Sequence, residues 1–199
     1  MAAGDSTPSF DDEPSGAAVH AFAWPGAAEL DERLLEEIGR AERHGTQLSC
    51  LLVVVDNLDE MAGEGSRSEG AVGELREQTM AYIAGALRRE VRRFDRVGLP
   101  SDRELLIVLP GADGPRGEMV ARRVLDRLRA IKVEARGRRR PLRISVGLAA
   151  WRADTTPATM LARARAAAER SANGENGAAG GLAEGHDEPL VGEPTSPPS

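Results

Sequence analysis

The sequence predicts an α+β fold in which a β-α-β-β-α-β (split βαβ) core forms an antiparallel-containing sheet with helices packed on it. Leu48–Val55 is an apolar run of strand length, as expected for a strand covered on both faces. A turn around Pro100–Arg103 separates two further strand-like runs, which indicates a hairpin. Segments with apolar residues at helical spacing alternate with these runs. We expect the helices to cover one face of the sheet.

The predicted elements follow in the order helix, strand, helix, strand, strand, helix, strand, helix. Gly45 lies at the end of the first helix, and residues 56–70 are expected to form a loop. In chain order, the expected elements are a helix over 28–44, a strand over 48–55, a helix with Leu75, Thr79, Met80, Ile83, Leu87 and Val91 at helical spacing, strands over 96–99 and 105–109, a helix over 116–131, a polar hairpin over 134–141, a strand over 142–150 and a helix over 157–172.

Two of these helices carry further signals. Thr156 suits the N-cap of the last helix, and Pro157 suits its first turn. The helix over 116–131 has apolar residues at helical spacing, and its expected buried side chains are Met119, Val120, Val124, Leu128 and Ile131.

Charge divides the chain into a domain and two tails. Residues 1–22 form an expected disordered acidic N-terminal tail, residues 23–172 the domain, and residues 173–199 a disordered acidic C-terminal tail. The formal net charge is −6, but the tails hold nine acids and no Lys or Arg. Residues 22–172 therefore hold 23 acidic against all 26 basic residues, an excess that suits an anionic ligand.

Several function classes are excluded. No signal peptide or membrane-spanning run is recognisable, so we expect a cytoplasmic protein with no membrane contact. Cys50 has no disulfide partner, and the three histidines lack metal-ligand spacing. Aromatic residues make up 3% of the chain, which leaves the basic run 136–140 without base-stacking platforms. We therefore expect no nucleic-acid partner and interpret that run as a solvated hairpin.

The chain resembles the GGDEF domains, the diguanylate cyclases, over about residues 22–176. Where that family carries Gly-Gly-Asp/Glu-Glu-Phe, this chain has Ser101-Asp102-Arg103-Glu104-Leu105. The resemblance implies a GGDEF/nucleotide-cyclase-like fold. Three parts of the chain carry the resemblance. Leu48–Met61 is similar to the family's first strand and its Asp-x-Asp-x-Phe-Lys-x-Ile continuation, and Arg92–Gly111 is similar to its central hairpin. Arg143–Ala149 and Met160–Arg165 are similar to its Ser-Ile-Gly-Val strand and its Leu-Leu-x-Arg-Ala-Asp helix.

The resemblance implies that catalysis is lost. In active members two acidic groups hold the divalent cations that bridge the GTP phosphates, and their positions fall on Val54 and Arg103. The family's phosphate-facing Lys falls on Asp59. Asp56 and Glu104 could still pair as acids, although both also suit a strand end and a turn. We therefore expect no enzyme activity, no bound Mg²⁺ and no other cofactor.

The same resemblance implies that the family's product-binding inhibitory site is retained. Its Arg-x-x-Asp pair falls on Arg92 and Asp95, and its second Arg, on the following helix, falls on Arg123. Guanidinium groups can stack on guanine or bond its O6 and N7 edge, and a carboxylate can accept the N1 and N2 protons. The alternative is an exposed Arg92–Asp95 ion pair at a helix end.

Three functions remain open at this stage. The first is a catalytically inactive GGDEF-like signalling domain that binds cyclic di-GMP at Arg92, Asp95 and Arg123 and passes the signal to a protein partner. The second is a ligand-free pseudo-cyclase that acts as an interaction module, through a homodimer or by docking on an active cyclase. The third is a residual diguanylate cyclase.

Overall fold

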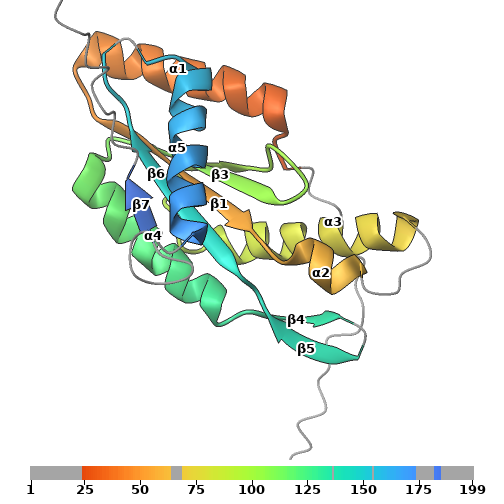
Figure 1. Ribbon diagram of the computed structural model, residues 1–199. Helices are drawn as coiled ribbons and strands as arrows, with labels where there is room; N and C mark the ends of the chain where they lie inside the picture. The colour runs from red at the N-terminus through yellow and green to blue at the C-terminus, as the bar shows by residue number, and fades with distance from the viewer. Residues whose placement is uncertain (1–23, 64–68, 136, 154, 174–181, 185–199) are drawn as a thin grey trace, which may run out of the picture.

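The computed structural model describes residues 24–63, 69–135, 137–153, 155–173 and 182–184. A five-stranded sheet at its centre has the order β2-β3-β1-β6-β7, and β4 and β5 form a separate hairpin (Figure 1). The strands are β1 (Leu48–Val55), β2 (Arg96–Gly98), β3 (Glu104–Pro110), β4 (Lys132–Ala135), β5 (Arg138–Pro141), β6 (Ile144–Ala150) and β7 (Leu182–Glu184). The helices are α1 (Ala27–His44), α2 (Leu58–Gly63), α3 (Glu69–Leu87), α4 (Gly114–Arg129) and α5 (Pro157–Ala172).

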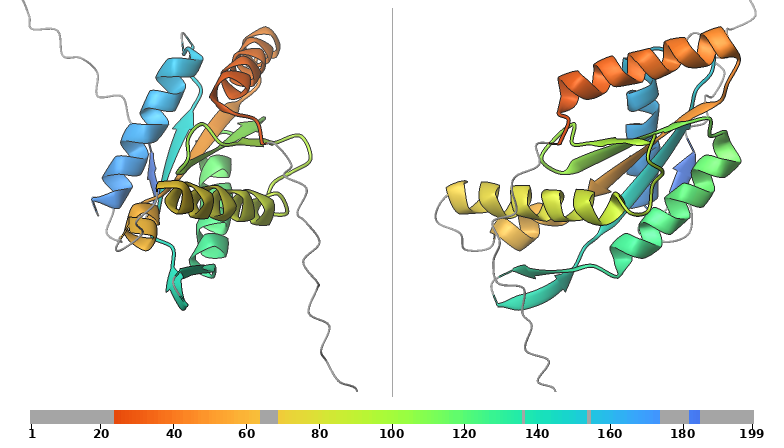
Figure 2. Two further views of the ribbon diagram at one scale, coloured as in Figure 1. Left: turned by 90° about the vertical axis from the view of Figure 1, so that its right-hand side faces the viewer. Right: turned by 180° about the vertical axis from the view of Figure 1, so that it is seen from behind.

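Helices cover both faces of the sheet, so the expectation of one covered face is wrong (Figure 2). Side chains of β1 alternate between two cores. Leu51, Val53 and Val55 pack with α2, α3 and α4. Cys50 and Leu52, on the other face, pack with α1 and α5. Because successive residues of a strand face opposite sides, a strand that is apolar throughout needs cover on both.

The central strand runs antiparallel to both neighbours. Val54 faces Glu104 of β3 and Ser145 of β6 in the register. β1 begins and ends at the predicted residues. The register matters for function because it brings the carboxyl end of β1, the start of β3 and the start of β6 to one place.

Helix α5 has the predicted start. The Thr156 hydroxyl accepts the backbone N–H of Thr159, and Pro157 is the first helical residue. The helix packs directly on β6 at Gly147, where an added Cβ would lie 2.0 Å from the carbonyl oxygen of Ala164. Only a glycine lets the two backbones approach this closely.

Met119 is 65% exposed, so its predicted burial is wrong. The buried face of α4 includes Gly117 and Ala121, because Leu148 presses on the helix there: an added Cβ at Gly117 would lie 2.7 Å from a Leu148 methyl group. The helix therefore contacts the sheet here through small residues, and not through Met119 as the hydrophobic pattern predicts.

Other boundaries differ from the prediction. α2 lies within residues 56–70, which were expected to form a loop, and α3 ends at Leu87 rather than continuing to Val91. β7 lies within the expected C-terminal tail, 173–199, and pairs in parallel with β6. Residues 1–22 and the remainder of that tail after Asn173 lie outside the described residues. Among the described helices, none is long and apolar enough to cross a membrane.

Candidate functional site

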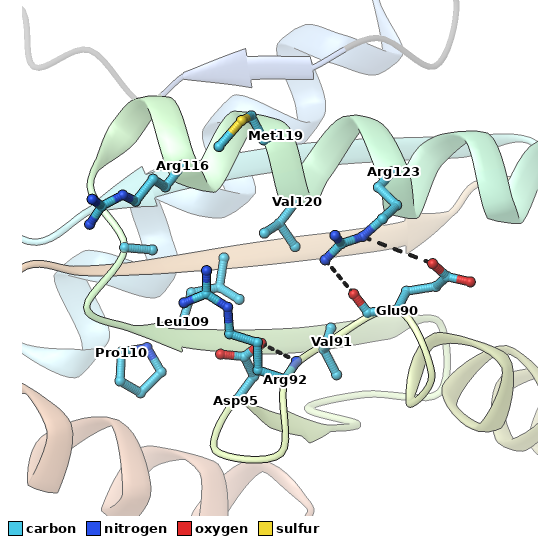
Figure 3. A pocket seen from close by; sticks show the side chains of 11 residues that line it. Glu90, Val91, Arg92, Asp95, Leu109, Pro110, Arg116, Met119, Val120 and Arg123 are labelled. Atoms are coloured by element: carbon cyan, nitrogen blue, oxygen red, sulfur yellow. Dashed lines mark hydrogen bonds and ion pairs between the residues drawn. The ribbon is translucent and has the colours of Figure 1, made fainter.

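A pocket of about 350 Å³ lies between the turn that follows α3, the end of β3 and helix α4 (Figure 3). Arg92 and Asp95 come from the turn, and Arg123 comes from α4. The fold thus brings together the three residues that the sequence singled out, and we refer to this cavity as the Arg92 pocket. Val91, Leu109 and Val120 give it apolar walls.

The turn holds Asp95 rigidly. One carboxylate oxygen of Asp95 accepts the backbone N–H of Arg92 at 2.6 Å, and the N–H of Asp95 donates to the carbonyl oxygen of Arg92 at 3.1 Å. Asp95 is 3% exposed, and burial raises the pKa of its carboxyl group. The Arg92 guanidinium lies 5.7 Å from the centre of the Phe94 ring. This arrangement differs from the exposed Arg92–Asp95 ion pair left as an alternative.

Arg123 is held by Glu90, a residue that the sequence analysis did not select. Its Nη2 donates to the carbonyl oxygen of Glu90 at 2.5 Å, and its Nε lies 3.9 Å from the Glu90 carboxylate. The same carboxylate lies 3.7 Å from Nε of Arg127. A ligand that binds Arg123 therefore competes with an internal carboxylate.

Arg116 also lines the pocket and was likewise missed. It lies two helical turns before Arg123 on α4, and Figure 3 shows the two guanidinium groups toward opposite ends of the cavity. Its side chain donates to the carbonyl oxygen of Gly111 at 3.3 Å. The spacing of seven residues was visible in the sequence, but the many other arginines gave no reason to select it.

A second pocket of about 200 Å³, the Glu104 pocket, lies where β1, β3, β6 and α5 meet. It brings together Val54 and Arg103, the positions that the family resemblance related to metal binding, with Asp56 and Glu104, the two acids that could still pair. Arg165 of α5 binds both carboxylate oxygens of Glu104, at 2.9 and 2.8 Å, and these hydrogen bonds lower the pKa of that carboxyl group.

Asp56 of this pocket and two acids outside its lining, Asp59 and Asp102, are also engaged, and Glu169 of α5 lines the pocket as well. Asp56 accepts the Ser145 hydroxyl at 2.6 Å, and burial raises the pKa of its carboxyl group. Arg76 binds Asp59 at 2.5 Å and Asp102 at 3.2 Å, which joins α2, α3 and the hairpin turn. Among the residues that the structure describes, no group of three side chains is arranged to hold a metal ion.

The profile described as "Diguanylate cyclase, GGDEF domain" matches residues 25–177. The chain belongs to the GGDEF domain family. DgcP, a diguanylate cyclase of Pseudomonas aeruginosa, is 23% identical over 147 residues, which cover 74% of this chain and 21% of DgcP. The chain thus spans about a fifth of that relative. The GGDEF resemblance found in the sequence is confirmed.

Solved structures share the fold of this chain. The diguanylate cyclase SiaD from P. aeruginosa, in complex with its activator SiaC, has a TM-score of 0.69 at 24% identity, over 81% of this chain and 58% of SiaD. The GGDEF domain of DgcB from Caulobacter crescentus, in complex with c-di-GMP, has a TM-score of 0.69 at 14% identity, over 81% and 91% of the two chains. These likenesses confirm the predicted α+β fold class.

Proposed function

We propose that this GGDEF-family domain binds cyclic di-GMP in the Arg92 pocket, does not cyclise GTP, and passes the nucleotide signal to a protein partner. One observation carries the proposal: Arg92, Asp95 and Arg123, from two separate segments, line one pocket with apolar walls. The DgcB domain, which shares the fold, was solved in complex with c-di-GMP.

The pocket has the chemistry that a guanine nucleotide needs. Planar guanidinium groups bind phosphate oxygens or the O6 and N7 edge of guanine through paired hydrogen bonds. One oxygen of Asp95 is occupied by the Arg92 backbone, which leaves the other to accept guanine N–H groups. The rigid turn lowers the entropy cost of binding, because Asp95 is already fixed before the ligand arrives.

Loss of catalysis is supported by the side chains of the Glu104 pocket. Val54 offers no metal-ligating atom, and Arg103 brings positive charge to the position where the family holds a cation. Glu104 is bound at both oxygens by Arg165. A Mg²⁺ ion would have to displace that guanidinium, so we expect neither metal binding nor turnover.

A second candidate is a ligand-free pseudo-cyclase that serves as a protein interaction module, either as a homodimer or on an active cyclase. The internal Glu90–Arg123 contact favours it, since Arg123 already has a partner within the protein. A protein partner also has a precedent in the family fold, because SiaD was solved in complex with its activator SiaC.

Calorimetric titration with cyclic di-GMP separates the two candidates. Saturable micromolar binding is expected for the wild-type chain and should be lost in Arg92→Ala and Arg123→Ala. Arg122→Ala is the matched control, because Arg122 is the neighbouring residue on α4, its side chain is 74% exposed, and it pairs with Glu118 outside the pocket. No heat from a chain shown to be folded would reject ligand binding and favour the interaction module.

Loss of catalysis needs its own measurement. Radiolabelled GTP, incubated with the chain and Mg²⁺ or Mn²⁺, should yield no cyclic di-GMP above the level of a buffer control. Product formation that scales with protein concentration would contradict the proposal and establish a residual diguanylate cyclase.

A further inference from the structure

In the Arg92 pocket, the positive charges of the two predicted arginines, Arg92 and Arg123, are offset by nearby acidic residues. Glu90 and Asp95 line the cavity together with Arg92 and Arg123. The formal charges of these four residues cancel. Electrostatic interactions also link Asp95 to both Arg92 and Arg123. Arg116 is the fifth charged residue of the lining, so the pocket has a net positive charge that would be lost if Arg116 were removed.

Arg116 is only lightly engaged within the protein. The Arg123 guanidinium bonds the Glu90 carbonyl oxygen at 2.5 Å, and the Arg92 guanidinium lies over Phe94. Arg116 makes one side-chain hydrogen bond, to the Gly111 carbonyl oxygen, at 3.3 Å, and within the described residues it has no carboxylate partner. It is exposed to solvent at the rim of the cavity. An incoming anion can bind it without displacing a carboxylate.

The position of Arg116 extends the reach of the site. Seven residues on α4 separate it from Arg123, which places both on one helix face about 10 Å apart along the axis. Val120 lies between them in the pocket wall, and the Arg92 guanidinium lies across from α4 (Figure 3). A ligand with two separated anionic groups and apolar or aromatic faces matches this arrangement.

We propose that Arg116 is a third ligand-binding arginine of the Arg92 pocket, and that the net positive charge of the pocket depends on it. The proposal rests on the proposed function and names a further residue of its ligand site. Arg116 is expected to bind a phosphodiester group of cyclic di-GMP at the end of the cavity away from Arg123.

Three variants test this residue by titration with cyclic di-GMP. Arg116→Ala is expected to fold, because the Arg116 backbone N–H is capped by Asp113 at 3.0 Å independently of its side chain. We expect it to bind about tenfold more weakly, as for one lost hydrogen bond to a charged group. Arg116→Lys keeps the charge but loses the paired hydrogen-bond donors of the guanidinium, so its affinity should lie between those of Arg116→Ala and the wild type. Arg122→Ala removes the same charge from the same helix outside the pocket and should bind as the wild type.

Salt dependence adds an independent readout. Added NaCl should weaken wild-type binding more steeply than binding by Arg116→Ala, because salt screens the charge that the variant lacks. Equal affinity of Arg116→Ala and wild type would overturn this inference and leave the proposed function intact. Equal weakening in Arg122→Ala would also overturn it, since overall charge would then explain the effect. Absence of binding in the wild type would overturn both.

Discussion

Replacing Gly147 with alanine tests the closest helix–sheet contact of the domain. The added Cβ would lie 2.0 Å from the Ala164 carbonyl oxygen and 2.5 Å from the Ala168 nitrogen. Ordinary contacts begin at 3.4 Å, so α5 would have to retreat by about 1.4 Å. Both opposing atoms belong to the helix backbone, so no side chain can rotate away to make room.

The size of the effect follows from this geometry. Overpacking in a core costs about 1 to 3 kcal/mol. We expect the upper end, about 3 kcal/mol, because the helix must move as a whole and loosen the packing of buried residues such as Met160 and Ala167. At about 2 to 4 °C per kcal/mol for a chain of this size, the melting temperature should fall by about 6 to 12 °C.

Thermal unfolding followed by circular dichroism measures the effect. Gly85→Ala is the matched control: Gly85 lies on the exposed side of α3, and an added Cβ there would have no atom within 4 Å. That variant should gain up to about 1 kcal/mol from improved helix propensity. A Gly147→Ala chain that melts within about 2 °C of the wild type would refute the reasoning, because α5 would then yield at almost no cost.

Three other outcomes are expected. Glu90→Gln should tighten cyclic di-GMP binding by up to about fivefold, because Arg123 loses a competing carboxylate, and calorimetry that finds weaker binding would contradict this. Arg165 lowers the pKa of the Glu104 carboxyl group in the folded state. The stability that this pair contributes is therefore fully present above the pKa of unfolded glutamate, about 4.3, and is lost as pH falls through the lower pKa of the folded state. Urea unfolding of Glu104→Gln should therefore show a smaller loss of stability in acid than that of the wild type. Burial raises the pKa of the Cys50 thiol to about 12, so a thiol reagent should modify it only after unfolding, and rapid labelling of the native chain would contradict its placement.

Much of the fold could be predicted because its signals are local. The β1 strand is apolar on both faces, and its ends coincide with the ends of the apolar run. The start of α5 has a cap residue, Thr156, followed by Pro157, and both act as predicted. The six-residue helix α2 was missed because it is too short to show a helical period.

The candidate site was only partly predictable, for a physical reason. Arg92 and Asp95 are close in sequence, and the family resemblance related Arg123 to them, so the pattern could place all three together. The contact between Arg123 and Glu90 joins two elements through a backbone carbonyl, and no residue pattern encodes it. Arg116 could not be distinguished from the other arginines until the fold showed which of them face a cavity.

The two pockets differ in how their arginines are used, and this difference supports the proposal of nucleotide binding without catalysis. In and beside the Glu104 pocket, Arg165 and Arg76 are bound to carboxylates of the same chain, so a phosphate that bound either guanidinium would have to break an existing ion pair. Arg103, at the family's metal position, repels a divalent cation. In the Arg92 pocket, Arg116 has no carboxylate partner within the described residues. An anion can therefore gain a charge-assisted hydrogen bond in that pocket at little cost, whereas in the Glu104 pocket the guanidinium of Arg165 is already bound to a carboxylate.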